Sequence, residues 1–400
     1  MGRRTVPGSL SPAVAAELPR WLARFADGEM TRRQFVARAV AAGLTLSAIG
    51  TLLAACGGGG GGGGAGAATP AAMSTDLPGT LRIYNWSEYT SPKVLKEFER
   101  KYGVKCDLML YDSNEQLTAH LKKKPDAYDV VVPEDAFVSV LASAGLIRPL
   151  DMSLIPNFEY VTEASFRRPP FDPGTDGKKY SVPYMFGTIG VAVRLDKVAD
   201  PGSSWSIMYD PRYKGRMSML DGSREVLGPA LFALGHSLNT TDQGELDEAT
   251  AKAIEQKPLV RVYSGSGMAG RMVSGLPLVE CWDGDVVTAM NQIGISKLKY
   301  LLPDEGYNVW MDGVCIPASS PNPYAAHLFL NFLLDPVNAA ESAGYIGYQP
   351  VVSAADPLIK NLVQRAMRPT PEIIAKGTFV KDLGSFNAAY DEAWAKVQAA

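Results

Sequence analysis

The alternation of strand and helix patterns in residues 81–145 constrains the fold of this chain more than any other feature. Three short stretches rich in β-branched and aromatic residues, at 81–86, 104–111 and 128–133, alternate with three stretches of helical spacing. The third stretch is almost continuously apolar, as is typical of a strand buried on both faces of a parallel sheet. The order β-α-β-α-β-α therefore favours an α/β fold with a largely parallel sheet.

Two long β-prone runs, at 180–193 and 309–317, enclose a second set of strand and helix patterns. We expect each run to cross from one lobe to the other, because a length of 400 residues suits two domains. The expected lobes are residues 77–187 plus 311–356 and residues 188–310 plus 357–400. Two α/β lobes joined by two crossing segments form a cleft, and clefts between domains are common sites for small ligands.

The first 76 residues are interpreted as an export signal and a tether. A twin-arginine pattern at Arg32-Arg33 precedes an uncharged apolar run over 39–55, and small residues stand directly before Cys56. This order resembles a Tat signal peptide, residues 1–55, that ends in a lipoprotein cleavage site; an uncleaved transmembrane helix is the alternative. Residues 56–76 hold eight consecutive glycines, which suit a flexible tether. We expect lipidation of Cys56 and anchoring on the outer face of the cytoplasmic membrane, in the periplasm or at the cell surface.

Composition and motif content argue against several classes of function. The formal net charge is −3, which gives no indication of nucleic-acid binding; without residues 1–55 the chain holds 32 basic and 39 acidic residues, a balance compatible with a cationic ligand. The three histidines and four cysteines lack metal-ligand spacing, so we expect no metal and no cofactor. Zinc-protease, nucleophile-elbow and phosphate-loop motifs are absent from the sequence, so we expect no enzyme activity.

Tryptophans and carboxylates occur together at the ends of predicted strands, where ligands of α/β sheets collect. The clusters are Trp86-Ser87-Glu88-Tyr89, Arg224-Glu225, Trp282-Asp283-Gly284-Asp285 and Trp310-Met311-Asp312. A linear polyamine needs carboxylates for its ammonium groups, and flat aromatic walls for its methylene groups and for cation–π contact. The structural alternative is that these tryptophans belong to the core and that the acids are helix caps or surface groups.

Several motifs together resemble those of the spermidine/putrescine-binding periplasmic proteins of bacterial ABC importers, over residues 80–400. The motifs are residues 84–89, 128–133, 181–184, 213–215, 224–226, 310–312 and 331–336. The resemblance implies a two-lobed type II periplasmic binding protein that closes on its ligand and is not an enzyme. It also implies delivery of putrescine or spermidine to ABC permease subunits that work with a separate ATPase. We expect a monomer.

The resemblance further implies which residues bind the ligand. Trp86, Tyr89 and Trp310 are similar to an aromatic box, and Trp282 to a further aromatic wall. Acidic residues similar to amine-binding carboxylates are Glu88, Glu225, Asp312 and, as in putrescine-type members, Asp285. Ser87 and Glu134 complete the predicted set of ligand-binding residues.

The chain departs from the family pattern at three positions. Glu134 stands where the family usually has Ser, Gly222 where spermidine-type members carry an acid, and an apolar residue near Val380 where the family has Gln. Glu134 is either an added amine ligand or an acid at a helix N-terminus. These departures leave the particular polyamine open. Binding of a different small organic cation on the same fold, and polyamine sensing by a lipoprotein, are the alternative functions.

Overall fold

The structure is a computed structural model that describes residues 74–172 and 178–400. These residues belong to one compact unit, Ala72–Ala400. The predicted signal peptide and Cys56 lie outside the described residues, so lipidation and export stay predictions.

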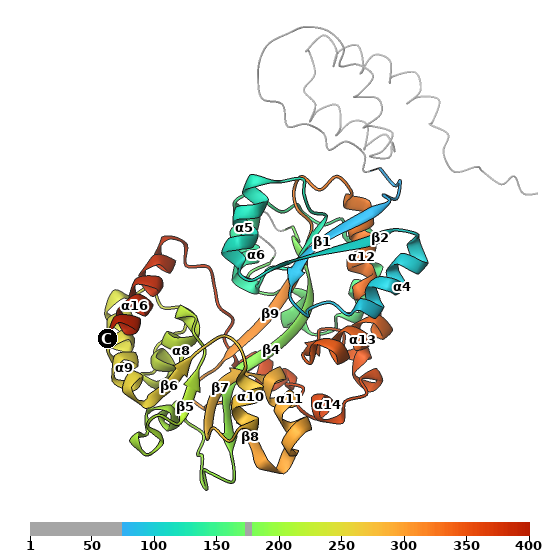
Figure 1. Cartoon of the computed structure of the whole chain (residues 1–400). Helices are drawn as coiled ribbons and strands as arrows, with labels where there is room; N and C mark the ends of the chain where they lie inside the picture. The colour runs from blue at the N-terminus through green and yellow to red at the C-terminus, as the bar shows by residue number, and fades with distance from the viewer. Residues whose placement is uncertain (1–73, 173–177) are drawn as a thin grey trace, which may run out of the picture. The chain divides into compact units, whose positions relative to one another are not determined.

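The unit alternates strands and helices along the chain (Figure 1). The strands are β1 (Thr80–Trp86), β2 (Lys105–Tyr111), β3 (Val130–Val131), β4 (Ser181–Arg194), β5 (Met217–Met219), β6 (Val260–Tyr263), β7 (Leu278–Trp282), β8 (Leu298–Leu301), β9 (Asn308–Cys315) and β10 (Gln349–Pro350). The helices up to β7 are α4 (Pro92–Tyr102), α5 (Asn114–Lys123), α6 (Asp135–Ser143), α7 (Ala164–Arg167), α8 (Ser223–Ala233), α9 (Gln243–Gln256) and α10 (Met268–Val273). The remaining helices are α11 (Asp283–Ile293), α12 (Pro323–Leu333), α13 (Pro336–Ile346), α14 (Leu362–Ala366), α15 (Pro371–Lys376) and α16 (Asn387–Ala399).

Local sequence signals account for where the first helices begin. Ser91 caps α4 by accepting the N–H of Lys93, and Pro92 occupies the first turn, where its missing N–H costs nothing. Ser113 caps α5 by accepting the N–H of Gln116 at 3.2 Å.

The sheet is parallel at its two flanks and antiparallel at its centre. Its order is β2-β1-β3-β9-β4-β7-β5-β6, with β8 and β10 also paired to β4. The pairs β1–β2, β1–β3, β5–β6 and β5–β7 are parallel, whereas β9 is antiparallel to both β3 and β4, and β4 is antiparallel to β7. The prediction of a parallel sheet therefore holds for the flanks only. The central strands are antiparallel because the chain crosses along β4 and returns along β9.

β4 and β9 are the two crossing segments that the sequence predicted, and β4 links separate hydrophobic cores. Its first half, including Val182 and Phe186, packs in a core with β1, β2 and α12. Beyond Gly187, residues Ile189 and Val191 contribute to two other cores on the β5–β7 side. Figure 1 shows β4 and β9 running between the part that holds β1 and β2 and the part that holds β5 to β8.

The C-terminal segment contacts cores on both sides of the crossing strands. Ile374 and Phe379 belong to the core that contains β1, whereas Tyr390 and Val397 of α16 pack with α8 and α9. The residue boundaries predicted for the two lobes stay predictions.

Candidate functional site

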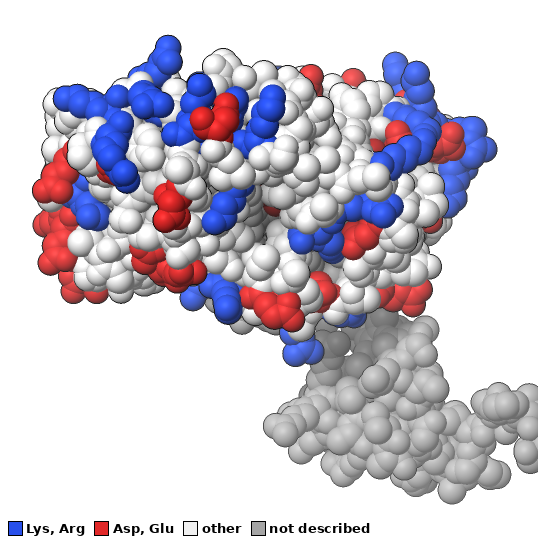
Figure 2. All heavy atoms as spheres, turned by 90° about the horizontal axis from the view of Figure 1, so that it is seen from below, with Lys and Arg blue, Asp and Glu red and all other residues white. Residues whose placement is uncertain are grey.

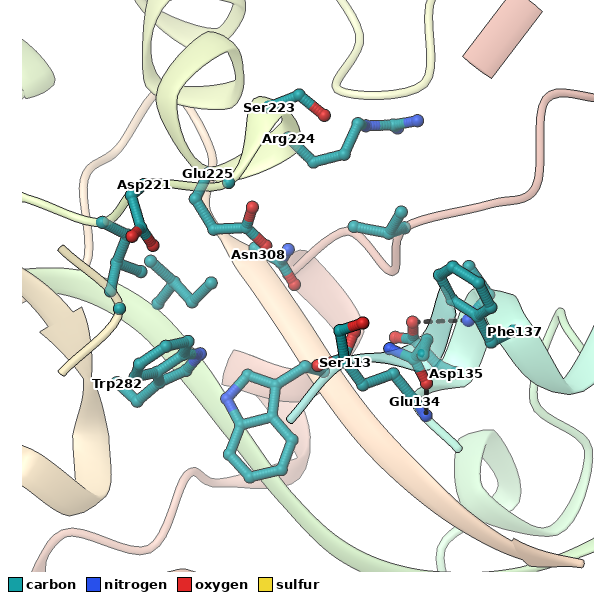
Figure 3. Close-up of a pocket in the computed structure, with 18 of the residues that line it drawn as sticks. Ser113, Glu134, Asp135, Phe137, Asp221, Ser223, Arg224, Glu225, Trp282 and Asn308 are labelled. Carbon is teal, nitrogen blue, oxygen red and sulfur yellow. Dashed lines mark hydrogen bonds between the residues drawn. The ribbon is translucent and has the colours of Figure 1, made fainter. Parts of the chain in front are cut away.

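A cavity of about 720 Å³ lies where the strand ends and helix starts converge. Its lining comes from the end of β1, the start of α6, the strand β9, the start of α8 and the end of β7. Figure 3 shows Glu134 and Asp135 at the start of α6 facing the same space as Glu225, at the start of α8, and Trp282. This is the location in which α/β sheets bind ligands, at carboxyl ends of strands and amino ends of helices.

Most, but not all, of the predicted ligand-binding residues line this cavity. The lining contains Trp86, Tyr89, Glu134, Glu225, Trp282, Trp310 and Asp312. Three predicted residues, Ser87, Glu88 and Asp285, are not part of the lining. Ser87 and Glu88 are exposed in the turn after β1, and Glu88 has a φ of 54° in the left-handed region. The carboxylate of Asp285 accepts a hydrogen bond from the backbone of Ala269, which directs it to α10.

Half-buried aromatic rings form walls of the cavity. Trp86 is fixed by its Nε1, which donates to the carbonyl oxygen of Val132 at 2.9 Å. Trp310 meets Tyr348 edge to face, with ring centroids 4.8 Å apart and an interplanar angle of 83°. Trp86 and Trp310 pack against a hydrophobic core, but neither is fully buried. Each therefore contributes one part of its ring to the core and leaves another part at the cavity wall. Such rings can contact methylene groups and cations.

Gly187 makes the position of Trp310 possible. The two residues are direct partners across the β4–β9 pair. A Cβ at Gly187 would lie 2.7 Å from Cζ2 of the Trp310 indole and would also collide with the carboxylate of Asp283. Only glycine therefore lets the indole lie flat against the neighbouring strand at this point.

Asp312 is a buried carboxylate of β9 that faces the cavity. It is 7% exposed, and its Oδ2 accepts a hydrogen bond from the hydroxyl of Tyr89. Burial raises the pKa of Asp312 to about 8; the Tyr89 hydrogen bond lowers it and the charge of Asp135 raises it. A cation in the cavity would relieve the cost of ionising this group.

Glu134 and Asp135 bring two more carboxylates to the same side of the cavity. Glu134 occupies the N-cap position of α6, but its side chain makes no capping hydrogen bond. Glu134 is exposed to the solvent of the cavity, but the surrounding protein removes most of the water around its carboxyl group. This desolvation, together with the negative charges of Asp312 and Glu225, raises the pKa of Glu134 to about 8. Asp135 is 6% exposed; its Oδ1 accepts the N–H of Ala136 at 2.6 Å, while its Oδ2 makes no hydrogen bond of good geometry with the described residues, although the backbone N–H of Met311 is near enough to lower its pKa. Burial raises the pKa of Asp135 well above its ordinary value.

Glu225 faces the cavity from the first turn of α8. Gly222 leaves room for its carboxylate, because a Cβ at Gly222 would overlap Oε2 of Glu225. Burial raises the pKa of Glu225, while its own backbone N–H and the neighbouring Arg224 lower it. Arg224 also lines the cavity, but its Nη2 donates to Leu238 O at 2.7 Å and to the side chain of Asn239 at 2.6 Å.

Several lining residues were not predicted from the sequence. Asn308 lies two positions before Trp310 in β9, and alternation along a strand places residues 308, 310 and 312 on one face, so this residue had a detectable signal. Asp135, adjacent to Glu134, was passed over as a site residue. Tyr348 and the α16 residue Trp394 join the lining through tertiary packing, which no local pattern indicates. Val380, the position of one family departure, does line the cavity.

The charge of the lining favours a cation. Among the lining residues, eight carry carboxylates and one, Arg224, carries a positive charge. This imbalance is local to the cavity: the face seen in Figure 2 carries both Lys or Arg and Asp or Glu side chains, so it is not covered by charge of one sign. The cavity therefore suits a small organic cation with an apolar backbone.

In the described ranges, no helix combines the length and the apolar character needed to cross a bilayer.

Comparisons with known proteins agree with this geometry. The profile of a family described as bacterial extracellular solute-binding protein matches residues 93–367. The spermidine/putrescine-binding periplasmic protein of Salmonella typhimurium is 36% identical over 326 residues, which are 80% of this chain and 92% of that protein. A solved spermidine/putrescine ABC transporter substrate-binding protein from Streptococcus pneumoniae is 28% identical with a TM-score of 0.71, and a solved lipoprotein of Treponema pallidum is 30% identical with a TM-score of 0.72. Each alignment covers 80% of this chain and 99% of the other.

Proposed function

The chain belongs to the family of bacterial extracellular solute-binding proteins, and from this premise we propose that it captures a polyamine and delivers it to an ABC importer. The observation that carries the proposal is the cavity, where carboxylates from β9, α6 and α8 face a space walled by Trp86, Trp282 and Trp310. Ammonium groups pair with the carboxylates and methylene groups lie against the rings. The names of the relatives, which bind spermidine or putrescine, support the same ligand class.

The proposal places the protein outside the cytoplasm as a carrier without enzyme activity. The family is described as extracellular, and its relatives are solute-binding proteins of transporters. A Tat-type signal over residues 1–55 and acylation of Cys56 would hold the body at the membrane, because stable anchoring takes more than one acyl chain. The lipoprotein from Treponema pallidum supports this arrangement.

Isothermal titration of the full chain, purified in detergent, tests the ligand class. We expect micromolar or tighter binding of at least one of putrescine, spermidine and spermine, and no measurable binding of the matched control choline, a cation without a second charge. If the folded protein bound choline but no polyamine, its ligand would be a different organic cation. Polyamine binding without loss of polyamine uptake in cells that lack the gene would favour sensing over transport.

A further inference from the structure

Three carboxylates on three different elements form a connected set across the cavity. Glu134, at the start of α6, lines the same cavity as Asp312 on β9 and Glu225 on α8, and the charge of each of the two raises the pKa of Glu134. Glu115 of α5 raises it further, and a hydrogen bond from the side chain of Asn114 lowers it. Glu134 thus couples the carboxylate on β9 to the carboxylate on α8.

The Glu134 carboxylate is available to a ligand. Its side chain takes no part in capping α6, it is exposed within the cavity, and no Lys, Arg or His of the described residues forms an ion pair with it. The one basic residue of the lining, Arg224, is held by Leu238 and Asn239 instead. A cation brought by the ligand is therefore the natural partner of Glu134.

Asp135 adds a second acidic group to this part of the cavity. It follows Glu134 in the chain and is 6% exposed; its Oδ2 makes no hydrogen bond of good geometry with the described residues, although the backbone N–H of Met311 is near enough to lower its pKa. A buried acceptor left unsatisfied costs free energy, so a positive charge nearby is favoured. An ammonium group next to Glu134 is therefore favoured.

Resting on the proposed polyamine function, we propose that Glu134 binds an additional ammonium group and makes the cavity prefer a linear triamine to a diamine. A triamine places one ammonium group at each of Asp312, Glu134 and Glu225, with its methylene groups against the tryptophan walls. A diamine leaves one of the three carboxylates without a partner in a desolvated site, which weakens its binding. The sequence left Glu134 open between an added amine ligand and an acid at a helix N-terminus; the preference for a triamine goes beyond that expectation.

The test compares spermidine with putrescine on the full chain and on Glu134→Gln, by isothermal titration. We expect Glu134→Gln to weaken spermidine binding by about 10- to 100-fold, as for loss of one charged hydrogen bond, and putrescine binding by much less. The ratio of the two dissociation constants is the decisive quantity, because a merely structural role for Glu134 would weaken both ligands equally. Glu97→Gln, a partly exposed glutamate of α4 outside the cavity that pairs with Arg100, is the matched control and should leave both affinities unchanged.

The outcomes separate this proposal from the function it rests on. If the wild-type chain binds neither polyamine, the proposed function fails. If it binds polyamines but Glu134→Gln leaves the spermidine-to-putrescine ratio unchanged, the function stands and the role of Glu134 is wrong. Thermal melting of both variants checks folding; should Glu134→Gln unfold, Glu134→Asp, which keeps the charge but shortens its reach, is expected to raise the dissociation constant of spermidine relative to that of putrescine.

Discussion

The two sides of the cavity differ in how their carboxylates are balanced. On the first wall, defined here as Glu134, Asp135 and Asp312, burial raises the pKa of each acid, the charge of a neighbouring acid raises it further, and none of the three forms an ion pair with a basic side chain of the described residues. On the second wall, defined as Arg224 and Glu225 at the start of α8, burial also raises the pKa of Glu225, but the adjacent Arg224 and the helix N–H lower it.

This difference predicts where the positive charge of the ligand contributes most to binding affinity. A cation that reaches the first wall relieves desolvation and mutual repulsion at once, whereas a cation at the second wall adds to a site that is partly balanced. Binding should therefore depend more on the first wall than on the second.

Asp312→Asn should give the largest effect. Asparagine still accepts the hydrogen bond of the Tyr89 hydroxyl but leaves the ligand's ammonium group without a charged partner in a buried site. We expect polyamine affinity to fall by about 100- to 1,000-fold, or roughly 3–4 kcal/mol, in an isothermal titration. Asp107→Asn, on the exposed face of β2, is the control and should bind normally. Unchanged affinity in folded Asp312→Asn would remove this residue from the site.

Glu225→Gln should give a smaller effect. The Arg224 charge and the start of α8 already compensate this carboxylate, so its loss should weaken polyamine binding by about 10-fold. Because an acid in the first turn of a helix interacts with the helix dipole, we also expect about 0.3–1 kcal/mol of lost stability in a denaturant titration. A loss of affinity equal to that of Asp312→Asn would show that the two walls do not differ.

The sequence predicted the features that depend on local pattern. The two β-prone runs became β4 and β9, and Trp310 and Asp312 share the cavity. The two-lobed α/β class with two crossing segments is also confirmed, by the strand order and by the solved relatives.

Features set by long-range packing were missed. The antiparallel centre of the sheet follows from the chain crossing and returning, which strand patterns do not encode. Asp285 had a carboxylate in a suggestive motif, but its hydrogen bond to the backbone of Ala269 takes it to α10 and outside the cavity lining, so its role as a ligand residue stays a prediction. Tyr348 enters the cavity from a segment with no ligand-like pattern, because it packs edge to face on Trp310.

If a bound cation ionises the first wall, ligand binding must release protons from these carboxyl groups, and counting the released protons shows whether it does. Glu134 and Asp312 have pKa values of about 8 in the free protein, and a nearby ammonium group lowers the pKa of a carboxyl group. Below about pH 8 the free protein therefore holds protons that the complex releases, so affinity should rise as the pH rises from about 6 to about 8.

The measurement is titration of spermidine into the full chain near pH 7, in buffers of different ionisation enthalpy. We expect release of about one proton or more per ligand, and less in Asp312→Asn if binding remains measurable. Tight binding with no proton release and with an affinity independent of pH would contradict it.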